Sequence, residues 1–188
     1  QLEGKDIRIC MDEWNYWYGP HIYGELGTRY YMRDAMGIAA GLNEYSRQSD
    51  MVFMANYAQT VNVIGCIKTN TTSSVFDATG QVLKLYRQQF GTVPVTISGE
   101  TRPLDIAATL FADCSKLTLS IVNPTWDEVK VPLTLLNGSV TGEAELWQVT
   151  APDDMATNEP GRPENVRITG PARVPSAREL TVGPASIN

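Results

Sequence analysis

The chain has 188 residues, of which 43% are hydrophobic and 19% are charged, and its formal net charge is −6. This length fits one large domain or two small ones, and the hydrophobic content is ordinary for a packed globular protein. The negative charge, without any cluster of lysines and arginines, argues against nucleic acid or an anionic membrane surface as the main partner. No stretch is long and apolar enough to predict a membrane-spanning helix.

The three cysteines, Cys10, Cys66 and Cys114, lie far apart in the sequence. They form no CxxC pair and no Cys/His spacing typical of zinc, so the cysteines predict no zinc site. We expect three buried free thiols, which favours a reducing compartment.

The first half of the chain predicts alternating strands and helices. Apolar runs at residues 7–11 and 52–55 predict short strands, and residues 29–48 and about 81–90 predict helices. Arg47 suits the last turn of the first helix, and Gly91 would end the second. The order β-α-β-α is the repeating unit of a parallel sheet or a (β/α) barrel. The residues expected to be buried are Met32, Ala35, Met36, Ala39 and Leu42 in the first helix and Val82, Leu83, Tyr86 and Phe90 in the second.

The second half of the chain carries no helix signal. Turn residues separate short β-rich runs at residues 93–97, 104–111, 116–122, 129–136, 144–149, 165–168 and 179–182. This spacing predicts an antiparallel β-sandwich. A stretch rich in proline and acidic residues, 151–163, predicts a long surface loop. The sequence thus predicts an α/β portion over residues 1–92 and an all-β domain over residues 93–188.

The run DEWNYWY follows the first predicted strand directly. Strict alternation would place Ile7, Ile9, Met11 and Glu13 on one face, provided that no bulge intervenes. Asp12 then points to the opposite face from Glu13, so the two carboxylates cannot act as a catalytic pair. A carboxylate at the carboxyl end of a barrel strand lies where barrel active sites form. Two salt-bridged or helix-capping acids are the simpler alternative.

Four aromatic residues follow these acids in the sequence: Trp14, Tyr16, Trp17 and Tyr18. Aromatic faces stack on sugar C–H surfaces, which favours a carbohydrate ligand. We expect at least two of the four rings to form a hydrophobic plug instead. His21, which is the single histidine, is expected to be an exposed bystander.

Three amide side chains, Asn56, Gln59 and Asn62, follow the second predicted strand at a spacing of three residues. If a helical turn begins there, they share one face and can bind sugar hydroxyls. We expect one of them to be functional and two to be structural.

Together these motifs resemble a known family. The segments ICMDEWNYWY, GIAAGLNEYSRQSD and VFMANYAQTVNVIG occur in the order found in the last third of glycoside hydrolase family 51, the α-L-arabinofuranosidases. The later segment TLSIVNPTWDEV fits the family too, and LWQVTAPDDMATNEPGRPENV resembles a variant of its closing segment. The resemblance implies the last two βα units of a (β/α)8 TIM barrel followed by an antiparallel β-sandwich. It also implies retaining hydrolysis of terminal α-L-arabinofuranosyl groups from hemicellulose and arabinan, without metal or cofactor.

The resemblance also assigns roles to individual residues. Glu13 resembles the catalytic nucleophile at the end of barrel strand seven. Trp17 resembles the aromatic wall near the leaving group, and Gln59 resembles the residue that hydrogen-bonds the bound arabinose. Supporting roles fall to Asp12, Asn15 and Asn56.

One part of the family's machinery has no counterpart here. Barrel strands one to six, and the acid/base glutamate that follows an asparagine on strand four, would lie upstream of Gln1. The pair Asn43-Glu44 sits inside the first predicted helix, so we reject it as that motif. We therefore expect residues 1–188 to be a fragment whose partners are the missing N-terminal portion of the same enzyme and an arabinose-containing oligo- or polysaccharide. Alone it should be inactive, and the parent enzyme could be a homo-oligomer.

Two other functions stay open at this point. One is endo-hydrolysis of a β-glucan or xylan by an enzyme of the same family. The other is a non-catalytic carbohydrate-binding or interaction module formed by the sandwich. The module would need exposed aromatic rings: Trp126 lies in a predicted turn and should be exposed, whereas Trp147 lies in an apolar strand and should be part of the core.

Overall fold

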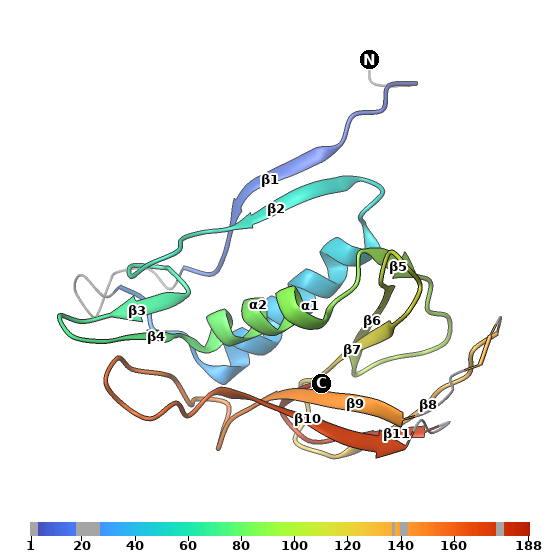
Figure 1. Cartoon of the computed structure of the whole chain (residues 1–188). Helices are drawn as coiled ribbons and strands as arrows, with labels where there is room; N and C mark the ends of the chain where they lie inside the picture. The colour runs from blue at the N-terminus through green and yellow to red at the C-terminus, as the bar shows by residue number, and fades with distance from the viewer. Residues whose placement is uncertain (1–3, 18–26, 137, 140–142, 176–178) are drawn as a thin grey trace.

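The structure is a computed structural model that describes residues 4–17, 27–136, 138–139, 143–175 and 179–188. Its elements form three layers (Figure 1): a two-stranded ribbon on one side, two helices in the middle, and a larger β-sheet on the other side. Tyr18 and His21 lie outside the described residues, so the structure does not address the expectations for them.

The ribbon consists of β1 (Ile9–Trp14) and β2 (Val52–Tyr57), which pair in parallel. Helix α1 (Met32–Arg47) connects the two strands, so a β-α-β unit is present as the sequence predicts. Strand β1 begins later than expected and continues through Asp12 and Glu13. A short hairpin of β3 (Ile67–Thr69) and β4 (Ser74–Phe76) then leads to helix α2 (Ala78–Gln89). The sequence does not predict this hairpin, because strands of three residues are too short to show a period.

Helix α1 confirms the predicted apolar stripe. The side chains of Met32, Ala35, Met36 and Ala39 are buried, and Leu42 packs against the same cluster. At the start of the helix the Tyr31 N–H donates to Asp34 Oδ2 at 2.8 Å. This bond satisfies one of the main-chain N–H groups that the first turn of any helix leaves without a partner.

Helix α2 begins three residues before the expected position because Asp77 caps it, its side chain accepting from the Ala78 N–H at 2.8 Å. Val82 is buried as predicted, and Leu85, which the sequence did not assign to the buried stripe, is buried too. Gly91 follows the helix, but not as a left-handed cap. A Cβ at Gly91 would collide with the main-chain oxygen of Leu110, so the glycine permits a close approach of the chain to its neighbouring strand.

The second half forms two antiparallel sheets, as expected for a sandwich. The large sheet has the order β10-β9-β12-β7-β6-β5, and β8 pairs with β11 in a small sheet. The strands are β5 (Val93–Val95), β6 (Asp105–Leu110), β7 (Leu117–Asn123), β8 (Val129–Pro132), β9 (Glu143–Thr150), β10 (Arg167–Pro175), β11 (Glu179–Val182) and β12 (Ser186–Ile187). Only β12, two residues long, was not predicted.

Two apolar clusters hold the layers together. Ile121 of β7 packs with Val131 and Val182 between the two sheets. Its neighbour Val122 points to the opposite face, where the sheet packs against both helices. The predicted boundary between residues 92 and 93 thus divides the sequence but not the hydrophobic core.

Polar contacts join the same layers. Asn43 Nδ2 of α1 donates to Asp105 Oδ1 at 2.6 Å, and Arg47 forms an ion pair with Asp105 at 3.0 Å. The Tyr86 hydroxyl of α2 makes a short hydrogen bond with Ser120 Oγ of β7. The helices are therefore fixed on the large sheet by side chains from both α1 and α2.

The expectation of three buried thiols is wrong. All three cysteines are unpaired, but Cys10 and Cys114 are exposed and Cys66 is only half-buried. Cys10 lies on β1, whose residues from Ile9 to Glu13 are exposed, and Cys114 lies in the β6–β7 turn with φ of +58°. Within the described residues, no helix is long and apolar enough to cross a membrane.

Candidate active site

The two acids of the DEWNYWY run lie at an irregularity of the ribbon. Met11 pairs with Ala55 and Trp14 with Tyr57, so Asp12 and Glu13 together face a single residue of β2, Asn56. Two residues opposite one define a β-bulge, which re-aims side chains and bends the strand. The condition for strict alternation is therefore not met, and opposite-face geometry no longer separates Asp12 from Glu13.

Glu13, Asp12 and Asn56 are all exposed. Because β1 and β2 are parallel, their carboxyl ends meet at the same end of the ribbon (Figure 1). Gln59 follows β2 by two residues and is exposed as well. The structure thus gathers a carboxylate and the amides of Asn56 and Gln59 at the carboxyl end of a parallel β-α-β unit. Their catalytic and binding roles stay predictions.

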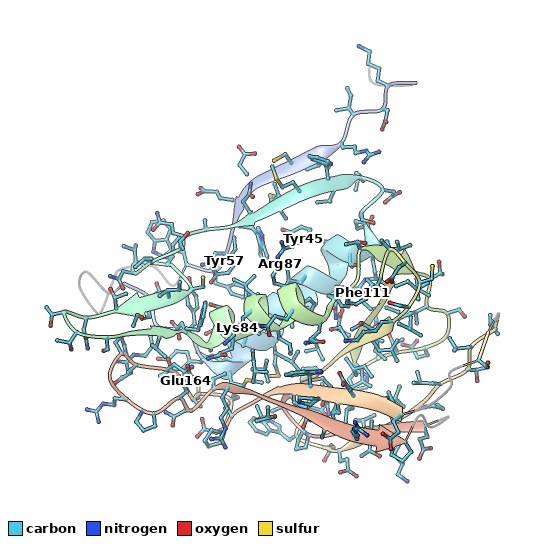
Figure 2. All side chains as sticks on the ribbon, viewed as in Figure 1. Tyr45, Tyr57, Lys84, Arg87, Phe111 and Glu164 are labelled. Atoms are coloured by element: carbon cyan, nitrogen blue, oxygen red, sulfur yellow. The ribbon has the colours of Figure 1, made fainter. Side chains whose placement is uncertain are left out.

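Among the described aromatic rings, Trp14 fits the expected plug, whereas Tyr16 contacts α1 but stays 41% exposed, so the expectation of two plug rings is not confirmed. Trp14 meets Tyr45 and Tyr57 edge to face, with ring centroids 5.1 and 5.6 Å apart. Figure 2 shows Tyr45 and Tyr57 between the ribbon and the helices. The Tyr16 hydroxyl lies against Gly37, where any Cβ would collide with it, and burial and the nearby Asp34 raise the pKa of Tyr16.

Trp17 is more exposed than either Trp14 or Tyr16, with 63% of its surface accessible. It lies three residues beyond the end of β1, on the segment that follows Glu13. An indole that remains accessible on this segment is available to stack on a sugar ring.

Asn15 is a structural brace between the two segments that follow the strands. Its Nδ2 lies 2.6 Å from the oxygen of Ala58, 2.6 Å from the oxygen of Ile64 and 2.7 Å from the Tyr30 hydroxyl. Its Oδ1 accepts from the Tyr16 N–H at 2.7 Å. Asn15 therefore links the end of β1 to the end of β2.

The shared-face expectation for the three amides is wrong. Asn56 belongs to β2, which continues to Tyr57, so no helical turn begins there. The Asn62 side chain forms two hydrogen bonds with Thr69: its Nδ2 donates to the Thr69 hydroxyl and its Oδ1 accepts from the Thr69 N–H, both at 2.9 Å. Asn62 is thus structural, and Asn56 and Gln59 are the exposed amides of the set.

Sequence reasoning missed a buried ion pair beneath this edge. Lys68 Nζ lies 3.9 Å from Asp77 Oδ2 and donates to the oxygen of Val63 at 3.0 Å. Burial raises the pKa of Asp77 to about 6 and lowers the pKa of Lys68. The aspartate before a helix is an N-cap signature that could have been recognised, but its pairing with Lys68 depends on the fold.

The rejected Asn43-Glu44 pair has structural partners. Asn43 is buried against Asp105, and Glu44 pairs with Arg47 one turn further along α1, at 2.9 Å. No group of three or more histidine, cysteine, aspartate or glutamate side chains within the described part of the chain is arranged to hold a metal ion.

Solved structures identify the class of protein as glycoside hydrolases. A family 51 α-L-arabinofuranosidase from Thermotoga petrophila RKU-1 superposes with a TM-score of 0.85 and 28% identity, over 97% of this chain and 42% of that one. The α-L-arabinofuranosidase of Thermotoga maritima in its arabinose complex gives a TM-score of 0.82 and 27% identity, with the same coverage.

The family follows from the sequence comparisons. The family model for the α-L-arabinofuranosidase C-terminal domain matches residues 12–186. The probable α-L-arabinofuranosidase C of Aspergillus flavus is 31% identical over 176 residues, which cover 83% of this chain. The chain therefore belongs to the α-L-arabinofuranosidase C-terminal domain family, in glycoside hydrolase family 51. It spans about a third of the length of that curated relative, 34%.

Proposed function

We propose that the chain is the C-terminal part of a retaining enzyme that releases terminal α-L-arabinofuranosyl groups from hemicellulose or arabinan, with Glu13 as the nucleophile. The observation that carries this proposal is the exposed Glu13 at the carboxyl end of β1, beside the exposed Asn56 of β2, in a chain of this family. Active sites of (β/α) barrels form at that end of the strands.

In the proposed reaction, a Glu13 oxygen attacks the anomeric carbon of the arabinofuranosyl group. The bond to the leaving oxygen breaks while a second carboxylic acid gives that oxygen its proton. Water then hydrolyses the glycosyl ester on Glu13, and the second carboxylate takes the proton of that water. Gln59 and Asn56 offer amide donors and acceptors to sugar hydroxyls, and Trp17 offers an aromatic face.

Retaining enzymes hold their two carboxyl groups about 5 to 5.5 Å apart. Asp12 is adjacent to Glu13 at the bulge, and we assign it a supporting role. The proposed acid/base residue lies on βα units that the rest of the same enzyme supplies. The exposed apolar side chains of the ribbon support such a partner: Phe53 is 66% exposed, and Ile9, Met11 and Met54 are exposed too. Neighbouring strands and side chains of a complete barrel would cover them.

Two experiments test the proposal. Residues 1–188 alone should not hydrolyse an aryl α-L-arabinofuranoside, because the acid and most of the pocket are missing, so full turnover by this chain would refute its role as one part of the catalytic unit. In the complete enzyme, Glu13→Gln should lower kcat by several orders of magnitude and abolish labelling of that position by an electrophilic arabinofuranosyl analogue. Asp12→Asn is the matched control, since it changes the neighbouring carboxylate. If labelling of the enzyme persists in Glu13→Gln, another residue is the nucleophile.

A second candidate function, carbohydrate binding by the sandwich, is favoured by one observation. Trp126, in the β7–β8 turn, is 66% exposed and lines a groove of about 400 Å³ against α1. If this ring binds sugar, Trp126→Ala should lose retention on arabinoxylan in affinity electrophoresis. Leu136→Ala, which removes an 82% exposed apolar side chain elsewhere in the sandwich, should not. Equal retention of both variants would leave the sandwich as structural support.

A further inference from the structure

The Tyr30 hydroxyl is buried at the point where the segments after β1 and β2 meet. The residue has no exposed surface and stands just before α1. Its hydroxyl lies 2.8 Å from the main-chain oxygen of Tyr16 and 3.1 Å from that of Ile64, and it accepts from Asn15 Nδ2 at 2.7 Å. One hydroxyl thus touches both segments.

Asn15 extends this contact. Its amide reaches the oxygens of Ala58 and Ile64, both at 2.6 Å. Tyr30 and Asn15 together therefore bind main-chain oxygens on both segments. Trp17 directly follows Tyr16, and Gln59 directly follows Ala58. Each of the two exposed side chains is one residue from an anchored carbonyl.

Tyr30 is itself fixed to the core. Its N–H donates to Asp77 Oδ2 at 3.2 Å, and Lys68 Nζ lies 5.2 Å from the centre of its ring. Burial raises the pKa of the Tyr30 hydroxyl, which keeps the hydroxyl neutral and able to donate a hydrogen bond. A buried hydroxyl that is lost leaves its partners unsatisfied, which is more costly than the loss of an exposed contact.

We propose that Tyr30 is a positioning residue that sets the separation of Trp17 and Gln59. It acts through Asn15 and the two main-chain segments and touches no sugar itself. The significance of that separation rests on the proposed function, in which both side chains contact one arabinofuranosyl group. The geometric part of the proposal can be tested without catalysis.

The geometric test uses the full chain labelled with 5-fluorotryptophan, whose four tryptophans give four ¹⁹F resonances. Trp17→Phe assigns the relevant signal. Tyr30→Phe keeps the ring and removes only the hydroxyl, and it should shift or broaden the Trp17 resonance while leaving that of Trp126 unchanged. Asn15→Asp, which removes the amide donors, should do the same and provides a second variant if Tyr30→Phe fails to fold.

Tyr86→Phe is the matched control. It removes a buried hydroxyl that bonds Asn43 Oδ1 at 2.8 Å on the far side of the helices, away from both segments. It should lower stability without moving the Trp17 resonance. A Trp17 resonance unchanged in folded Tyr30→Phe, with only a reduced Tm, would overturn the proposal and leave Tyr30 as a structural residue.

The catalytic test uses the complete enzyme. Tyr30→Phe should lower kcat/KM for an aryl arabinofuranoside about 10- to 100-fold, because misplacement by a fraction of an ångström to one ångström costs that much. Its pH profile should stay that of the wild type, since no acid or base is removed. An unchanged kcat/KM would overturn the positioning role. Absence of turnover in the wild-type enzyme would instead refute the proposed function, while the ¹⁹F test would still decide the geometry.

Discussion

Asn158 anchors the β9–β10 loop to the helical half, and its loss should destabilise the chain strongly. The side chain is 2% exposed. Its Nδ2 donates to the oxygens of Phe76 at 2.9 Å and Val166 at 2.7 Å, and its Oδ1 accepts from the N–H groups of Asn165 and Val166, both at 2.9 Å. Asn158→Ala removes all four hydrogen bonds at once.

The expected magnitude follows from the burial of the partners. A net hydrogen bond contributes about 1 kcal/mol, and a buried polar group left unpaired costs about 1–3 kcal/mol. Val166 is fully buried, so water cannot readily replace the lost bonds there, whereas Asn165 is exposed. We therefore expect a loss of about 3 to 5 kcal/mol, a large part of the roughly 5–15 kcal/mol that stabilises a typical domain.

Urea unfolding followed by far-UV circular dichroism measures this loss. Asn165→Ala is the matched control, because that exposed side chain makes one bond to the oxygen of Thr157, at 3.1 Å. The control should lose about 1 kcal/mol or less. If Asn158→Ala lost no more than Asn165→Ala, the loop would not be an anchor, and the reasoning from buried partners would fail.

Three further predictions concern the core and can be read from thermal or urea unfolding. Lys68→Met should lower the free energy of unfolding by about 3 kcal/mol or more near pH 8, since it leaves ionised Asp77 buried without its cation. The loss should be smaller near pH 5, where the Asp77 carboxyl can protonate. Equal losses at both pH values would contradict the pairing. Burial raises the pKa of Asp34 in the folded chain to about 6, above its pKa of about 3.8 in the unfolded chain. The contribution of Asp34 to stability is therefore complete below pH 3.8 and is lost as the pH rises through 6. Asp34→Asn should therefore weaken the pH dependence of stability between pH 4 and 7, and an unchanged profile would count against the burial argument. Gly91→Ala should lower the free energy of unfolding by about 1–3 kcal/mol, because the new Cβ collides with the main chain of β6. Gly138→Ala is the control and should be neutral, because no atom lies within reach of its Cβ. A neutral Gly91→Ala would show that the neighbouring main chain shifts to accommodate the methyl group.

The helices were predictable because their apolar period repeats over several turns. The stripe from Met32 to Ala39 needs no knowledge of the partner to be recognised, and the same holds for Val82 in α2. Leu85 lies inside the predicted helix, three residues after Val82, so the same period could have identified it; the expected stripe ran through Leu83 and Tyr86 instead, which are only half-buried. The short strands β3, β4 and β12 were missed because two or three residues carry no measurable period.

The candidate site was only partly predictable. Motif position placed Glu13 and Gln59 at the carboxyl ends of neighbouring strands, and the parallel pairing of β1 with β2 agrees. The bulge at Asp12 and Glu13 could not be foreseen, because it is a property of the register with Asn56. The Asn15 network was equally hidden, since it joins groups that are 43 and 49 residues apart in sequence.

The apolar cluster that crosses the predicted boundary has a consequence for dissecting the molecule. A cut at residue 92 would strip Val82 and Leu85 of the sheet on which α2 lies, and it would leave Val122 and Ile187 facing water. Neither half could then be studied as an independent unit, because the two halves share one hydrophobic core. The helices beneath the ribbon that carries Glu13 therefore depend on the large sheet for one of their buried faces.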